Sequence, residues 1–121
     1  MMSLQYNYSI LVGRLTRDPE LRRFSETATK LSFTLAVGRS YKRKDGTTVA
    51  DFIPVAMWGK SAEAGFKILK KGMPILVSGK IQVHSYEKEA EERWMTEVVV
   101  DTFELLQTLS EAKGKAQKLL A

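Results

Sequence analysis

Residues 31–37, Leu-Ser-Phe-Thr-Leu-Ala-Val, decide the fold class of this chain. Apolar side chains recur there at every second position, which is the period of a strand with one buried face. The stretch Phe52 to Trp58 has the same period, with Ile53, Val55 and Met57 on one face. A third alternation begins near Met73, and its apolar positions are Ile75, Val77, Gly79, Ile81 and Val83. These three stretches predict an all-β protein whose core lies against those apolar faces.

The remaining elements complete a small barrel. Further strands are expected over Tyr8 to Thr16, where Gly13 indicates a bulge or tight bend, over Leu21 to Phe24, and over Trp94 to Leu106. Asp45-Gly46 predicts a hairpin turn, Ser61 to Lys71 a helix with Phe66 on its apolar stripe, and Glu87 to Arg93 a charged hairpin tip. This order matches the five-stranded oligonucleotide/oligosaccharide-binding (OB) barrel, with one short helix between strands 3 and 4.

Four aromatic rings do not fit the expected core. Phe52 and Trp58 fall opposite the apolar positions of their strand, Tyr86 ends a polar row that contains Lys80 and His84, and Tyr41 adjoins a basic turn. Exposed rings among basic residues are typical of surfaces that hold single-stranded nucleic acid by stacking and charge. The alternative is that the rings are packed in the core, as aromatic residues of small β proteins often are.

Basic residues are concentrated in the first half of a chain whose formal net charge is +5. Between Arg14 and Lys44 there are nine basic and three acidic residues, an excess of six. Such an excess of positive charge indicates a polyanion as ligand. The alternative is a basic surface that only keeps the protein soluble, which gives the same excess. The expected phosphate contacts are Arg14, Arg17, Arg22, Lys42, Arg43, Lys60 and Lys80.

Catalytic and metal-binding residues are not apparent. The chain has no cysteine and a single histidine, His84, which we expect to be a polar strand residue facing the ligand. The carboxylates between Glu87 and Glu92 lack the pattern of a calcium loop. We therefore expect no enzyme activity, metal or cofactor. Without a secretory signal or an apolar run of membrane-spanning length, a cytoplasmic, nucleoid-associated location is expected.

Several stretches resemble the bacterial single-stranded DNA-binding protein family in order and approximate spacing. They are Gly13 to Arg22, Phe33 to Val37, Asp51 to Val55, Trp58 to Lys60, Lys71-Gly72 and Thr96 to Val99. The resemblance covers about residues 7 to 106. It implies an OB barrel that assembles as a homotetramer and binds single-stranded DNA without sequence preference. It also implies stacking on Tyr41, Phe52, Trp58 and Tyr86.

The expected organisation is a single-stranded DNA-binding domain over 1–106 and a short C-terminal tail over 107–121. Members of the family recruit other proteins through an acidic tip, whereas this tail contains Lys113, Lys115 and Lys118, so recruitment of replication or repair proteins is not expected. The expected roles are replication, recombination, repair or DNA uptake. Two alternatives stay open: a primosome-type protein-interaction module on the same barrel, and an RNA-binding domain.

Overall fold

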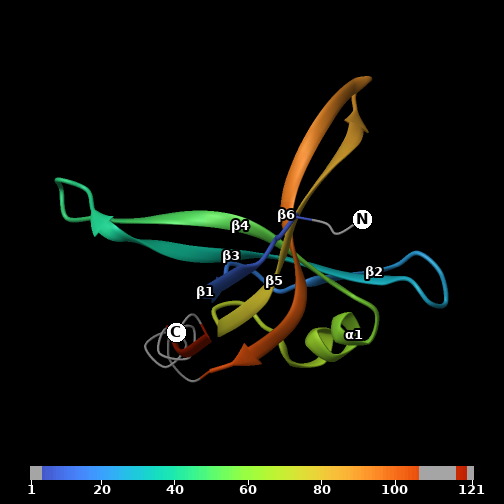
Figure 1. The fold of residues 1–121 in the computed structure, drawn as a ribbon, viewed down its shortest axis with the longest axis horizontal. Helices are drawn as coiled ribbons and strands as arrows, with labels where there is room; N and C mark the ends of the chain where they lie inside the picture. Colours follow the sequence, from blue (N-terminus) through green and yellow to red (C-terminus); the bar gives the residue numbers. More distant parts are fainter. Residues whose placement is uncertain (1–3, 107–116, 120–121) are drawn as a thin grey trace.

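The computed structural model describes residues 4–106 and 117–119, and six strands and one helix lie in the first range (Figure 1). The expected tail over 107–121 lies outside the described residues except for 117–119. Within the described ranges, no helix has the length and apolar character that a membrane crossing requires. The elements are β1 (Ser9–Leu15), β2 (Glu20–Arg23), β3 (Thr29–Lys42), β4 (Thr48–Trp58), α1 (Gly59–Ile68), β5 (Pro74–Lys88) and β6 (Glu91–Leu105).

The strands form one sheet that curls back on itself. Their order is β1-β5-β6-β4-β3-β2, and an additional pairing of β1 with β3 joins the sheet into a ring of β1, β5, β6, β4 and β3. β2 continues the sheet beyond the ring by pairing with the start of β3. The predicted OB-type arrangement is confirmed, and its helix lies between β4 and β5 once the short strand β2 is counted.

The core fills the inside of this ring. Leu31, Phe33 and Leu35 of β3 are buried, as are Val55 and Met57 of β4, so the alternation in both strands is confirmed. Helix α1 lies against the end of the barrel through Ala62 and Gly65, its two buried residues. A Cβ atom at Gly65 would lie 2.9 Å from Leu31 Cδ2, so a larger residue there would force the Leu31 side chain to shift.

The helix differs from its predicted form. It begins at Gly59 instead of Ser61 and ends at Ile68 instead of Lys71. Leu69 has extended backbone geometry, so it ends the helix, and its side chain is buried. The prediction that Phe66 belongs to the buried stripe is wrong: the glycine beside it makes the closest approach to the barrel, and Phe66 stays half-exposed.

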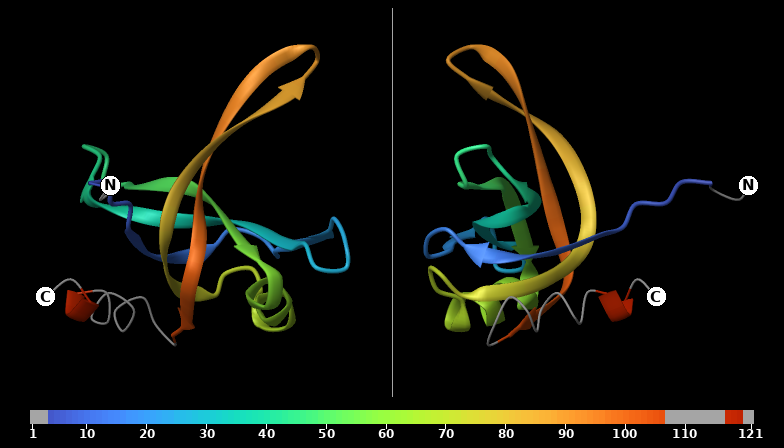
Figure 2. Two further views of the ribbon diagram at one scale, coloured as in Figure 1. Left: turned by 45° about the vertical axis from the view of Figure 1, so that its right-hand side comes forward. Right: turned by 90° about the vertical axis from the view of Figure 1, so that its left-hand side faces the viewer.

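The second half of β5 and the first half of β6 form a two-stranded arm that projects from the barrel (Figures 1 and 2). The predicted charged tip over Glu87 to Arg93 is wrong in extent, because the strands run to Lys88 and from Glu91. Only Glu89 and Ala90 form the turn, both with positive φ. Such φ values match a tight hairpin turn, which normally selects glycine or asparagine.

Ile81 and Val83 lie on this arm and not in the core. Their exposed fractions are 46% and 57%, so the prediction that the whole apolar row of β5 faces the core is wrong beyond Gly79. Alternation places these side chains on the same side of the strand as Ile75 and Val77. The barrel ends before them, so no described element covers them.

The arm leaves the barrel at a close backbone contact. The pairing of β5 with β6 shifts by one residue between Ser78 and Gly79, which places Asp101 as an extra residue in β6. A Cβ atom at Gly79 would lie 2.0 Å from the carbonyl oxygen of Val99. Gly79 therefore permits a crossing that no other residue fits.

We expect Gly79→Ala to lower the free energy of unfolding by about 1–3 kcal/mol, the usual penalty of overpacking, because the clash is with backbone. Gly38→Ala is the matched control, since nothing lies within 4 Å of a Cβ atom built there. Urea unfolding of the two variants measures the difference. Equal stability of Gly79→Ala and the parent would contradict the close crossing.

Candidate nucleic-acid interface

Strand pairing places most of the predicted site residues on one outward face of the sheet, called here the outer face. Directly paired residues of neighbouring strands point to the same side. Arg14 pairs with Ala36, which pairs with Phe52. Arg22 pairs with Lys30, which pairs with Trp58.

The same face continues onto the arm. Ala56 points to the same side of β4 as Trp58. It pairs with Val99, which in turn pairs with Lys80. From Lys80 every second residue of β5 shares this side, which adds His84 and Tyr86. The outer face therefore collects residues from β1, β2, β4 and β5: Arg14, Arg22, Phe52, Trp58, Lys80, His84 and Tyr86.

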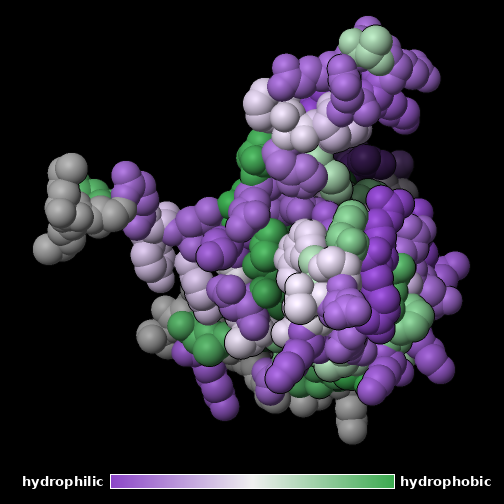
Figure 3. Space-filling model, turned by 90° about the vertical axis from the view of Figure 1, so that its right-hand side faces the viewer, coloured by the Kyte–Doolittle hydropathy of each residue, from purple (hydrophilic) through white to green (hydrophobic). Residues whose placement is uncertain are grey.

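The rings of the outer face are not core residues. Phe52 is 67% exposed, Trp58 42% and Tyr86 44%, and the buried core cluster contains none of them. The alternative that they are packed in the core is therefore wrong. Figure 3, which shows the side with β2 and α1, has a mostly hydrophilic surface interrupted by smaller apolar patches.

A row of contacts links the arm to the barrel across the outer face. The carboxylate of Glu97 is buried, and its Oε1 lies 3.2 Å from His84 Nε2 and 3.4 Å from Lys30 Nζ. Lys30 Nζ also lies 5.5 Å from the ring centroid of Trp58. Glu97 thus compensates the charge of Lys30 and holds its ammonium against the indole ring.

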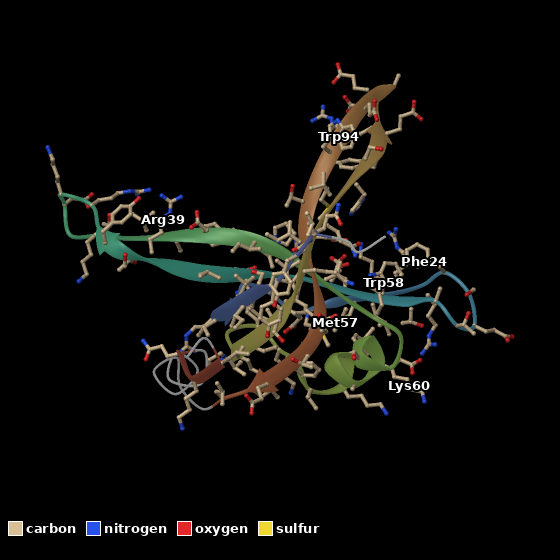
Figure 4. All side chains as sticks on the ribbon, in the orientation of Figure 1. Phe24, Arg39, Met57, Trp58, Lys60 and Trp94 are labelled. Carbon is tan, nitrogen blue, oxygen red and sulfur yellow. The ribbon has the colours of Figure 1, made fainter. Side chains whose placement is uncertain are left out.

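Phe24 extends this row and was not among the predicted site residues. Its ring is stacked on Trp58, with centroids 6.0 Å apart and planes at 29° (Figure 4). The guanidinium carbon of Arg22 lies 5.9 Å from the Phe24 ring centroid. The sequence holds one signal for this residue: Phe24 follows Arg22 by two positions and so shares its face if the strand geometry continues.

Tyr41 lies away from Trp58, toward the tip of the β3–β4 hairpin, where Figure 4 labels its neighbour Arg39. Arg39 donates a hydrogen bond of 2.7 Å to the Tyr41 hydroxyl and two to the Asp51 carboxylate, of 2.7 and 3.0 Å. The hydrogen bonds from Arg39 lower the pKa of Asp51. Tyr41 is 55% exposed, and Arg39 fixes its position.

Three predicted phosphate contacts lie outside the paired rows of the outer face, whereas Lys42 pairs with Thr48, which is on the Phe52 side of β4. Arg17 is in the loop between β1 and β2, Lys42 and Arg43 are near the hairpin tip, and Lys60 is in the first turn of α1. All four are exposed. Among the described residues, the lysines and arginines in ion pairs are different ones: Arg23, Lys30, Arg39 and Arg93.

A groove of about 640 Å³ lies beside Phe24, with Arg22, Lys30 and Glu20 among its lining residues. Across the part of the chain that the structure describes, no three histidine, cysteine or acidic side chains gather as metal ligands would. The geometry is that of a binding surface, with rings for flat apolar groups and cations for anions.

Comparison with known proteins gives consistent results. Residues 6–106 match the model of the Single-strand binding protein family. The chain is 47% identical over 103 residues to "Single-stranded DNA-binding protein 2" of Clostridium acetobutylicum, covering 84% of this chain and 77% of that protein. It is 48% identical over 103 residues to "Single-stranded DNA-binding protein" of Clostridium tetani (84% and 70%) and 43% over 109 residues to that of Streptococcus pneumoniae (89% and 70%).

Proposed function

Because the chain belongs to the single-strand binding protein family, we propose that its outer face holds single-stranded DNA by base stacking and phosphate contacts. Binding of single-stranded DNA is the function that the family and the named relatives support. The observation that carries the mechanism is the strand pairing, which aligns three exposed rings with basic residues, among them Arg14, Arg22 and Lys80, on one side of the sheet.

Each group on the outer face has a role in this mechanism. Phe52, Trp58 and Tyr86 offer flat apolar surfaces to bases of any identity, so binding is sequence-independent. Arg14, Arg22 and Lys80 contact phosphates, and His84 lies between Tyr86 and Lys80 on the ligand side. Tyr41, Lys42, Arg43, Arg17 and Lys60 extend the surface at its margins. The chain acts as a binding protein, and its mechanism involves no catalytic step.

The two tryptophans of the chain offer a test, because they lie on opposite faces of the sheet. Trp58 is on the outer face, whereas Trp94 pairs with Ser85 on the other side of the arm from Tyr86. We expect oligo-dT to quench the emission of Trp58 in a Trp94→Phe chain and to leave Trp94 nearly unchanged in a Trp58→Phe chain. In addition, Trp58→Ala should weaken binding by about 1–3 kcal/mol, the loss of one stack. Trp94→Phe, which keeps an apolar ring on the opposite face of the arm, is the control and should bind like the parent.

Oligo-rU and duplex DNA of equal length complete the titration. Tighter binding of oligo-rU than of oligo-dT would favour the RNA-binding alternative. Quenching of Trp94 without quenching of Trp58 would place the ligand on the face opposite the outer face and would contradict the proposal. Weak binding of every nucleic acid would favour the protein-interaction module.

Salt dependence tests the phosphate contacts separately. Each phosphate that a cation neutralises adds about 0.7 to the slope of log affinity against log salt for a single strand. Removing the charge in Arg22→Ala or Lys80→Ala should therefore reduce the slope by roughly that amount. Lys67→Ala is the control, since Lys67 is in the last turn of α1, away from the paired rows. Slopes that stay equal in all variants would contradict the assignment.

We propose further that the chain assembles as a homotetramer, with the segment Gln5 to Ser9 pairing across a two-fold axis. Oligomerisation is typical of the family. Ile81, Val83 and Trp94 form an exposed apolar patch on the arm, on the side away from Tyr86. The Asn7 side chain exchanges two hydrogen bonds with the backbone of Ile81, at 2.7 and 3.0 Å, so the N-terminal segment lies along the edge of β5 near this patch.

Light scattering at micromolar concentration measures the assembly. The parent chain should have the mass of a tetramer, and Val83→Asp a smaller mass, because a carboxylate would be placed in an apolar contact. Tyr86→Asp on the opposite face of the same arm is the control and should keep the parent mass. A monomeric parent would refute the assembly.

Roles in replication, recombination, repair or DNA uptake all need a sequence-independent single-strand binder, and such a ligand fits a cytoplasmic, nucleoid-associated protein. The expectation that the tail recruits no replication or repair protein concerns residues 107–121, of which the structure describes only 117–119. It stays a prediction, as does the division into a domain over 1–106 and a tail.

A further inference from the structure

We propose that Phe24 and Arg22 form a separate nucleotide-binding subsite beside Trp58, which carries the DNA strand from the barrel onto the loop between β2 and β3. The inference rests on the single-strand binding proposed above and adds a position that neither the rings predicted from the sequence nor the family resemblance includes. Its ligand is one nucleotide, with the base on the Phe24 ring and the phosphate at Arg22.

The Phe24 ring has the exposure and orientation of a stacking surface. It is 56% exposed and does not belong to the buried core or to the apolar residues packed against it. The Phe24 ring contacts the indole ring of Trp58, and the two ring planes are tilted by 29° from each other. Two nearly parallel exposed rings at neighbouring positions suit consecutive bases of one strand.

The loop that carries Phe24 is held by its own hydrogen bonds. The Phe24 backbone N–H donates to the Ala28 carbonyl at 2.8 Å, and the Ala28 N–H donates to Ser25 Oγ at 3.0 Å. The Thr27 N–H also donates to Ser25 Oγ, at 3.3 Å. These contacts hold the backbone at Phe24 and the stack on Trp58 orients its ring before a ligand arrives, which lowers the entropy lost on binding.

Charge favours a nucleotide over an apolar peptide at this place. Arg22 lies over the Phe24 ring, and no ion pair engages its guanidinium among the described residues, whereas the adjacent Arg23 pairs with Glu63 at 3.1 Å. The groove beside the ring is lined by Arg22, Lys30 and one carboxylate, that of Glu20. Because Glu97 compensates Lys30, Arg22 is the cation of the groove that remains for a phosphate. The subsite is continuous with Trp58, so a strand stacked there reaches it without a gap.

Photo-crosslinking with oligo-dT that contains 5-iododeoxyuridine tests the subsite directly. Trypsin releases residues 24–30 as one peptide, in which Phe24 is the sole aromatic residue, and releases Phe52 and Trp58 together in residues 45–60. We expect crosslinks in both peptides of the parent chain. Phe24→Leu, which keeps apolar bulk without a flat ring, should lose the crosslink in residues 24–30 and keep the one in residues 45–60.

Affinity measurements separate binding from a purely structural role. Phe24→Leu should weaken oligo-dT binding roughly 5- to 150-fold, the equivalent of one stack, with an unchanged thermal midpoint. Phe24→Trp, which keeps a flat ring at this position, should bind like the parent.

The outcomes distinguish this inference from the proposed function. A crosslink in residues 45–60 without one in residues 24–30 overturns the subsite and leaves the outer face intact. Weaker binding by Phe24→Leu without a crosslink at Phe24 would mean that the ring only positions Trp58, which also overturns it. No crosslink in either peptide would refute both.

Discussion

The close crossing of β5 over β6 at Gly79 is the constraint on which the rest of the structure depends. The absent side chain lets the β5 backbone approach the Val99 carbonyl, and the extra residue Asp101 keeps both Val100 and Phe103 directed toward the core. Beyond this point the two strands leave the barrel as an arm. Because the register is fixed at the crossing, Lys80 and the alternate residues after it share a face with Trp58, and one continuous surface extends from barrel to arm.

Ion pairs decide which cations of that surface are available to a ligand. Glu97 compensates Lys30 and positions it on Trp58, and Asp51 compensates Arg39 and positions it on Tyr41. Hydrogen bonds from Arg39 lower the pKa of Asp51, so this pair keeps its charges in mildly acidic solution. Lys30 and Arg39 thus orient rings, whereas Arg22 and Lys80, which have no ion-pair partner in the part of the chain that the structure describes, remain for phosphate.

Local patterning predicted the face of each strand well, because alternation depends only on strand geometry. It placed Phe52 and Trp58 opposite the core correctly. It failed at Ile81 and Val83, since a period of two says which side a residue faces and not whether another element covers that side. It missed Phe24 because the role of this ring depends on the pairing of β2, β3 and β4, which brings a loop residue beside a strand residue 34 positions away.

The central claim is that single-stranded DNA lies on the outer face, across barrel and arm. A crystal structure of the chain with oligo-dT tests it most directly, because the two faces of the arm carry different rings. The account predicts bases against Trp58, Phe52 and Tyr86, with phosphates near Arg22 and Lys80. Bases stacked on Trp94 beside Ile81 and Val83, with the outer face empty, would contradict it.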